Sequence, residues 1–224
     1  MAGLNFPGNA CYYHAASHKY NVAPFEFIPW ILGKCANVSE AIALLKTTNL
    51  IDTPYSNELP LTPLHWLLSD ATESITIEPL KEGLAICQNP VGVLTNNPPF
   101  PFQMFQLNQY LSLSSSPATN TFSKNLPLDS YSRGLGALGL PGDFSSTSRF
   151  VRACFLKENS VCGNSESESL SQFFHILDSV AHPRGSVYLE NNTYEITVYS
   201  SCCNTDKGIY YYTTYENRRI TGID

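Results

Sequence analysis

Positive charge is scarce in this chain. Of its 224 residues only 13 are Lys or Arg, against 19 Asp or Glu, and the formal net charge is −6. With so few Lys and Arg residues the chain has no basic stripe that could bind a phosphate backbone. We therefore do not expect nucleic acid as a partner. An acidic surface of this kind mainly favours solubility.

Long hydrophobic runs are also lacking. No apolar stretch approaches the roughly 20 residues that a transmembrane helix needs, and the first residues lack the charged and apolar regions of a signal peptide. We therefore expect a cytoplasmic protein with no membrane partner. The 43% hydrophobic and 12% aromatic content still suffices for the core of one globular domain.

Several familiar catalytic and metal-binding patterns are missing. The seven cysteines are odd in number and irregularly spaced, which suits neither a disulfide framework nor a zinc site, so reduced and mostly buried thiols are expected. There is no Gly-x-Ser-x-Gly motif and no His-Glu-x-x-His pair, so neither a serine hydrolase nor a zinc hydrolase is indicated. His65 and His175 are interpreted as structural or surface residues.

The remaining pattern predicts strands, then helices, then strands again. A helix is predicted over 37–48, with Asn37 as its N-cap and Glu40 three residues later. Apolar runs at 64–69, 74–78, 84–87 and 91–95 predict an antiparallel meander. Further predictions are a helix after Pro101, a long loop over 112–127, helices over 145–157 and 165–181, and strands near 194–201 and 209–215. This order is typical of an α+β fold with antiparallel sheets.

The segment Gly134–Gly139 reads GLGALG and satisfies the dinucleotide-binding pattern. That pattern requires a strand directly before it and a helix directly after it. Here Ser130–Ser132 precedes the glycines, and Pro141 and Gly142 follow them. We therefore interpret the segment as a flexible loop.

Three short polar motifs lie far apart in the chain and carry more information. They are Gly3–Gly8 (GLNFPG), Leu94–Pro98 (LTNNP), and Gly139–Asp143 (GLPGD) followed by Ser148–Phe150 (SRF). Together they resemble the choloylglycine hydrolases, a family that includes bile salt hydrolases and penicillin V acylases. The resemblance also includes Pro24–Trp30 and Lys207–Tyr212, extends over nearly all 224 residues, and is strongest toward bile salt hydrolases of gut lactic bacteria and enterococci.

The resemblance implies an αββα sandwich of antiparallel sheets, the fold of hydrolases with an N-terminal nucleophile. It places Met1 well inside a full-length member of the family. We therefore expect a single domain over residues 1–224 that lacks the N-terminal segment carrying the nucleophilic cysteine and a short C-terminal piece. Cys11, Cys35 and the later cysteines are not expected to replace it, because their α-nitrogens are in peptide bonds.

Candidate catalytic residues follow from the same resemblance. It implies that Asn96, through its side-chain amide, and Asn5, through its peptide N–H, stabilise the oxyanion of a tetrahedral intermediate. It also implies that Arg149 lies near the cysteine and favours its thiolate form. From the residues alone, each asparagine also fits a turn that caps its own backbone, and Arg149 fits a solvated helix residue or a salt-bridge partner.

The loop Asp52–Pro63 matches a family loop that borders the substrate pocket. Tyr55 and Leu59 are therefore candidate substrate-binding residues, where apolar side chains would cover the steroid or acyl portion. They equally fit packing residues under a loop, and the sequence does not separate the two interpretations.

Complete members of the family cleave the amide bond that joins a bile acid to glycine or taurine. The resemblance implies an N-terminal Cys mechanism, conjugated bile salts as small-molecule substrates, no metal or organic cofactor, and a homotetramer. Two alternatives stay open. One is a penicillin V acylase or other N-acyl amidase of the same family, and the other is a catalytically inactive, truncated remnant.

Residues 1–224 alone are expected to show no measurable bile salt hydrolysis, because they supply neither the nucleophile nor its adjacent amine base. Fusing a family N-terminal segment that begins with Cys should restore it, and changing that Cys to Ala should abolish it again. The measurement is release of free glycine or taurine by purified protein from a host without its own hydrolase. Clear turnover by residues 1–224 alone would contradict the expected mechanism.

Overall fold

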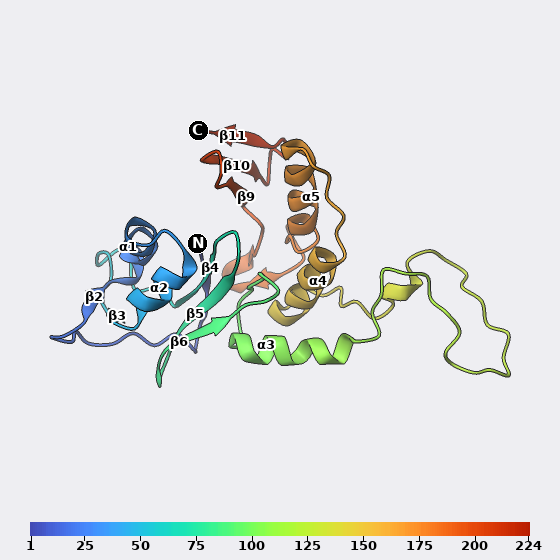
Figure 1. Cartoon of the computed structure of the whole chain (residues 1–224), viewed down its shortest axis with the longest axis horizontal. Helices are drawn as coiled ribbons and strands as arrows, with labels where there is room; N and C mark the ends of the chain where they lie inside the picture. The colour runs from blue at the N-terminus through green and yellow to red at the C-terminus, as the bar shows by residue number, and fades with distance from the viewer. The chain divides into compact units, whose positions relative to one another are not determined.

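The computed structural model describes all residues from Met1 to Asp224. The chain forms two compact units, Met1–Gln109 and Tyr110–Asp224, and each is described here by itself (Figure 1). Helices and antiparallel sheets occur together, as expected for an α+β fold. The single domain expected over residues 1–224 stays a prediction.

A four-stranded antiparallel sheet organises the first unit. Its strands, in spatial order, are β1 (Ala2–Asn5), β4 (Leu64–Ser69), β5 (Ser74–Leu80) and β6 (Gly83–Gln88). The last three confirm the first three strands of the predicted meander. Trp66, Ile75 and Ile77 are fully buried. Gly3 passes so close to Trp66 that a Cβ atom at residue 3 would lie 3.0 Å from the indole Nε1.

The fourth predicted strand, at 91–95, is wrong. These residues form neither a helix nor a strand. Gly92 has a φ of 59°, in the left-handed region, and the side chain of Asn89 donates to the carbonyl of Val93 at 2.9 Å. The backbone after β6 therefore bonds to side chains instead of to a neighbouring strand, and an apolar composition alone does not reveal this.

Two helices pack on this sheet's core. They are α1 (Phe27–Lys34) and α2 (Val38–Leu45), and β2 (Tyr20–Val22) pairs in parallel with β3 (Thr48–Leu50) beside them. Phe27, Ile31 and Ala41 belong to the same hydrophobic cluster as Trp66. The predicted helix start is confirmed, because the Asn37 side chain accepts a hydrogen bond from the backbone N–H of Glu40 at 2.9 Å.

The chain then enters α3 (Phe100–Gln106), which confirms the helix predicted near Pro101. Pro99 at the N-cap and Pro101 in the first turn fit here, because these positions need no intrahelical N–H donor. A 3-10 turn over Leu107–Tyr110 follows.

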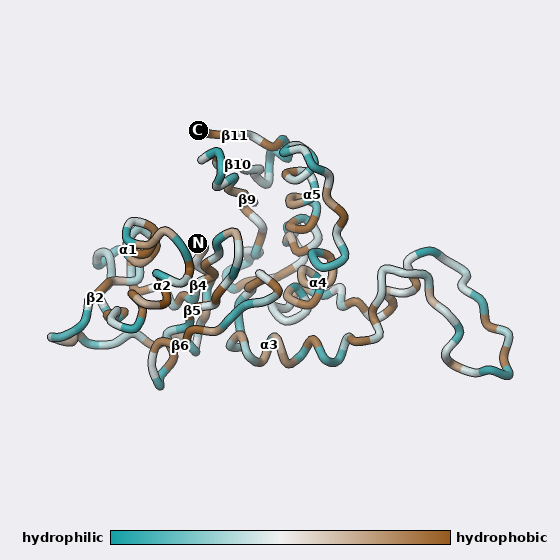
Figure 2. Tube along the Cα trace, in the orientation of Figure 1, coloured by the Kyte–Doolittle hydropathy of each residue, from teal (hydrophilic) through white to brown (hydrophobic).

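The second unit contains two predicted helices and a three-stranded sheet. Its elements are α4 (Ser146–Glu158), α5 (Glu166–Asp178), β9 (Tyr199–Asn204), β10 (Ile209–Thr214) and β11 (Thr221–Ile223), with a small pair β7 (Tyr188–Leu189) and β8 (Thr193–Tyr194). Both polar and apolar residues occur along α5 (Figure 2). Its first turn is closed by a capping box between Ser165 and Glu168.

The strand predicted near 194–201 is misplaced, and its main part lies at 199–204. A tight connection over 205–208 explains the shift, because Gly208 takes a φ of 70° and Asn204 accepts a hydrogen bond from the N–H of Lys207. The adjacent cysteines therefore belong to the strand. Residue 195 instead pairs with Val187, through a 3.0 Å backbone bond.

Other expectations can be checked directly. The glycine-rich segment forms a 3-10 turn at Leu135–Ala137 instead of a strand-to-helix junction, and residues 112–127 form the expected loop.

All seven cysteines are free, but only Cys154 is buried, so the expectation of mostly buried thiols is wrong. None of the helices is long and apolar enough to cross a membrane.

Candidate functional site

Asn5 is the last residue of β1, which lies at one edge of the four-stranded sheet. It aligns with Leu64 of β4, and the next backbone bond runs from the N–H of Phe6 to the carbonyl of Pro63 at 2.8 Å. Because hydrogen-bonded and non-bonded pairs alternate in an antiparallel ladder, the peptide N–H and C=O of Asn5 point away from β4. The Asn5 peptide therefore faces the open edge of the sheet.

The side chain of Asn96 lies beside this peptide. Its Nδ2 donates to the Asn5 carbonyl oxygen at 2.8 Å, and Nδ2 of the neighbouring Asn97 donates to the carbonyl of Pro7 at 2.8 Å. The structure thus brings together two predicted site residues that are 91 positions apart. Two N–H donors, the Asn5 peptide and the Asn96 amide, share one edge, an arrangement suited to polarising a carbonyl oxygen.

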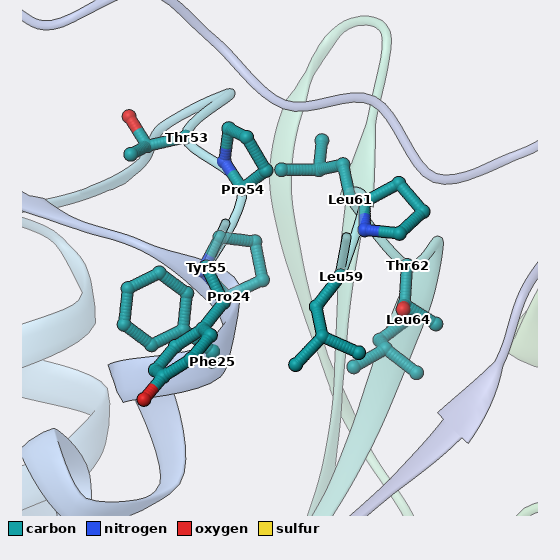
Figure 3. Close-up of a pocket in the computed structure, with 10 residues that line it drawn as sticks. Pro24, Phe25, Thr53, Pro54, Tyr55, Leu59, Leu61, Thr62 and Leu64 are labelled. Atoms are coloured by element: carbon teal, nitrogen blue, oxygen red, sulfur yellow. The ribbon is translucent and has the colours of Figure 1, made fainter. Parts of the chain in front are cut away.

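An apolar pocket is formed by the residues around Pro24, the loop over 53–62 and the first residue of β4 (Figure 3). Its volume is about 360 Å³, and it is lined by Pro24, Phe25, Thr53, Pro54, Tyr55, Leu59, Pro60, Leu61, Thr62 and Leu64. Both predicted substrate-binding residues belong to it. Tyr55 is 67% exposed and packs edge-on against Phe25 at 5.2 Å, while Leu59, 58% exposed, lies on the opposite side with Leu64.

The pocket and the asparagine pair share a structural element. Leu64, which lines the pocket, is the residue directly opposite Asn5 in the β1–β4 ladder, and such residues have Cα atoms about 4.5 Å apart in a non-bonded pair. The Tyr12 hydroxyl donates to the carbonyl of Thr62 at 2.7 Å and accepts from the N–H of Leu64 at 2.9 Å. Burial raises the pKa of Tyr12 to about 12, so it holds this end of the loop as a neutral donor.

Arg149 lies in the second unit, in the first turn of α4. Its Nε donates to the carbonyl of Phe144 at 3.1 Å, and its side chain is half-buried. Burial lowers the pKa of the guanidinium, but an arginine starts from an ordinary value above about 12 and stays charged at neutral pH. Arg149 is thus a permanent cation whose side chain is held by the backbone just before α4.

The Gly139–Asp143 motif forms the structure that precedes Arg149. Arg152 is buried, and its Nη1 donates to the carbonyls of Pro141 at 2.6 Å and Asp143 at 3.1 Å. The Asp143 carboxylate accepts from the N–H of Ser145 at 2.9 Å and from the hydroxyl of Ser148 at 2.6 Å. Hydrogen bonds from the side chains of Ser145 and Ser148, and from the Ser145 backbone, lower the pKa of Asp143 to about 2. The motif therefore fixes the turn from which α4 starts.

Three buried polar side chains near Asn96 were not identified as site residues from the sequence. They are His65 of β4, Glu78 of β5 and Gln103 of α3, all fully buried. The only sequence signal was a polar residue inside an otherwise apolar strand, as at Glu78 between Ile77 and Pro79. No group of three or more His, Cys, Asp or Glu side chains could hold a metal ion.

Comparison with known proteins identifies relatives over the whole chain. The family of linear amide C–N hydrolases called the choloylglycine hydrolase family matches residues 1–224. The bile salt hydrolase/transferase of Lactiplantibacillus plantarum is 54% identical over 223 residues, which is 100% of this chain and 69% of that protein. The bile salt hydrolase/transferase of Clostridium perfringens is 40% identical over 225 residues, covering 100% of this chain and 68% of that one.

Solved structures give the same result. A variant of conjugated bile acid hydrolase from Clostridium perfringens has a TM-score of 0.92 at 40% identity, over 100% of this chain and 69% of that one. Penicillin V acylase from Agrobacterium tumefaciens has a TM-score of 0.72 at 19% identity, over 96% and 60%, which shows the fold alone. These likenesses confirm the predicted fold class, an α+β fold of the type found in hydrolases with an N-terminal nucleophile.

The Asp143 contacts predict how stability depends on pH. A folded-state pKa of about 2 lies below the ordinary value of about 3.9, so this carboxylate stabilises the fold above pH 4 or so and loses that contribution as pH falls toward 2. Asp143→Ala should lower the melting temperature near pH 6, and the difference from the parent should shrink toward about pH 3. Thermal unfolding across this range is the measurement. A difference that stays constant would contradict the assignment.

Proposed function

The chain belongs to the choloylglycine hydrolase family of linear amide C–N hydrolases, and we propose that it carries the substrate pocket and oxyanion-binding residues of a bile salt hydrolase. The proposed reaction cleaves the amide bond that joins a bile acid to glycine or taurine. Relatives that are 54% and 40% identical over the full length of the chain bear the name bile salt hydrolase/transferase, which supports this choice.

The observation that carries the proposal is the contact between Asn96 and Asn5. An oxyanion needs two or more fixed N–H donors that point to one place. The 2.8 Å bond from Asn96 Nδ2 to the Asn5 carbonyl sets the amide beside a peptide whose own N–H faces the same open edge. We assign the Asn96 side chain and the Asn5 peptide as the two oxyanion donors.

The apolar pocket supports a substrate with a large hydrocarbon portion. Its lining of leucine, proline and aromatic side chains suits a steroid ring system, with Tyr55 and Leu59 as contacts on its two sides. Leu64 lines the pocket and is paired with Asn5 in the β1–β4 ladder, which supports assigning both features to one substrate site. Substrate binding and oxyanion stabilisation would thus share the β1–β4 ladder.

The proposed mechanism follows from the resemblance to the family. The α-amino group of an N-terminal cysteine accepts the thiol proton, and the sulfur attacks the amide carbonyl carbon. The C–N bond breaks, glycine or taurine leaves as the amine after taking up a proton, and a thioester remains. Water then releases the bile acid. The permanent charge of Arg149 is proposed to favour the thiolate.

A homo-oligomer is part of the proposal, the tetramer by resemblance. Large apolar side chains are strongly exposed between residues 122 and 138 of the second unit, among them Phe122, Tyr131 and Leu138. Exposed apolar groups that gather on one segment often mark a protein interface. This supports self-association through residues 122–138.

Substrate preference tests the proposed function. Residues 1–224, fused behind the N-terminal segment of the Lactiplantibacillus plantarum relative, should hydrolyse glycocholate with a kcat/KM at least about tenfold above that for penicillin V. The measurement is release of glycine or of 6-aminopenicillanic acid, with the Cys→Ala version of the added segment as the control. A strong preference for penicillin V would favour the acylase alternative instead.

Asn96→Ala in the same fusion should reduce kcat by about a hundredfold to a thousandfold and change KM much less, because an oxyanion donor acts mainly in the transition state. Asn108→Ala is the matched control, since Asn108 is exposed and its side chain also donates one bond to a backbone carbonyl, that of Phe105 at 2.7 Å. The control should keep its kcat. A normal kcat in Asn96→Ala would remove Asn96 from the catalytic residues.

A further inference from the structure

The segment 95–100 carries Asn96 and is held almost entirely by buried side chains. His65, Glu78 and Gln103 have no exposed surface, and Thr95 is only 5% exposed. They come from β4, β5 and α3, and yet their polar atoms converge on this one stretch of backbone. Burying such polar groups is unfavourable unless each is hydrogen-bonded, so their convergence calls for an explanation beyond core packing.

The His65–Glu78 pair holds the two ends of the segment. His65 Nε2 lies 2.7 Å from the carbonyl oxygen of Thr95, and its Nδ1 lies 3.1 Å from Glu78 Oε1. The other contacts of Glu78 are with the N–H of Phe100, which donates to Oε1 at 3.0 Å and to Oε2 at 3.2 Å. Two polar side chains therefore connect residue 95 to residue 100.

The hydrogen bonds also fix where the protons of this pair are. A carbonyl oxygen only accepts, so Nε2 of His65 carries a proton. The contact between Nδ1 and Glu78 Oε1 requires one further proton on one of these two atoms, because two lone pairs at that distance would repel. With both protons in place the pair has no net charge, which makes its complete burial tolerable.

Gln103 holds the interior of the same segment. Its Nε2 donates to the carbonyl of Asn96 at 2.6 Å and to that of Pro98 at 2.8 Å. Its Oε1 accepts a bond from the hydroxyl of Thr95 at 3.0 Å. Both N–H groups and the oxygen of this amide are thus used on residues 95–98, including Asn96 itself.

His65 also contacts the neighbour of Asn5. Its ring stacks on the buried ring of Phe6, with centroids 4.2 Å apart and planes 6° from parallel. Phe6 directly follows Asn5, and Thr95 directly precedes Asn96. One imidazole therefore fixes the residue next to each of the two asparagines.

We propose that His65, Glu78 and Gln103 are positioning residues that hold the Asn96 amide in place beside the Asn5 peptide. The inference rests on the oxyanion role given to that pair in the proposed function. Simple core stability would be served as well by apolar side chains of similar volume. The polar atoms of these three residues instead bond only to one another or to residues 95–100, which is what orienting Asn96 requires.

Gln103→Met in the active fusion tests the proposal, because methionine keeps the length of the side chain and removes its three bonds. We expect kcat for glycocholate to fall about tenfold to a hundredfold, as for a displaced catalytic group, with a change in KM below about twofold. In an Asn96→Ala background the same substitution should have no further effect on kcat, because it acts through Asn96.

Asn49→Leu is the matched control in the same unit. Asn49 is buried, and its Nδ2 donates to the carbonyl of His14 at 3.0 Å and to Asn21 Oδ1 at 2.9 Å, so neither bond involves residues 95–100. Its substitution should lower the melting temperature about as much as Gln103→Met does and leave kcat unchanged. An equal loss of kcat in both variants would show a merely structural role and overturn the proposal.

Glu78 provides a rescue test. Glutamine at this position can still accept the N–H of Phe100 through Oε1 and donate from its amide to Nδ1 of His65, whereas leucine can do neither. Glu78→Gln should therefore retain most of the kcat that Glu78→Leu loses. If Gln103→Met or Glu78→Leu does not fold, Thr95→Val, which removes the hydroxyl that donates to Gln103 Oε1, should still lower kcat.

Hydrogen exchange separates this proposal from the proposed function. The backbone amides of Asn96 and Asn97 should exchange faster in Gln103→Met than in the parent, and should be unchanged in Asn49→Leu. This measurement needs no substrate, so it tests the positioning role even if the fusion does not hydrolyse glycocholate. Unchanged exchange at these amides in Gln103→Met would overturn the proposal.

Discussion

Backbone groups that are buried outside a helix or a strand need hydrogen-bond partners, and in residues 95–100 those partners are side chains. Gln103 and the His65–Glu78 pair satisfy this backbone at both ends and in its interior. Without them the segment would have to form a strand or move into solvent. The position of Asn96, and with it the donor pair at the edge of β1, depends on this arrangement.

The second unit uses a related solution. Arg152 is buried between the loop before α4 and the end of α5, and its guanidinium donates to the carbonyls of Pro141, Asp143 and Ser179. A planar group with five N–H donors is well suited to collecting carbonyls from separate segments. In both units a long polar side chain projecting from a regular element fixes an irregular segment. The first segment contains Asn96 and the second directly precedes the helix that carries Arg149, the two residues that the family resemblance implies.

The sequence predicted the regular elements better than the irregular ones. Repeating apolar positions and the Asn37 cap located α2, β4, β5 and β6, because both signals are local. The run at 91–95 was predicted as a strand because its apolar residues are a local signal. The side chains that bond to its last residue, Thr95, come from His65, 30 positions earlier, and from Gln103, 8 positions later, and no local pattern reveals those contacts. The contact of Asn96 with Asn5 was expected only from the resemblance. The positioning role proposed for Glu78 depends on how β5 pairs with its neighbouring strands. That register cannot be read from the local sequence.

Bonded and non-bonded positions alternate along β1, and this alternation limits how the edge strand can change over evolution. The group proposed as the donor at residue 5 is its peptide N–H. Its direction is set by the alternation of bonded and non-bonded positions along the strand, not by the side chain. Exchanges at this position other than to proline leave the donor in place, whereas inserting or deleting one residue before Phe6 would rotate it into the sheet. The edge is therefore tolerant of substitution and intolerant of changes in length.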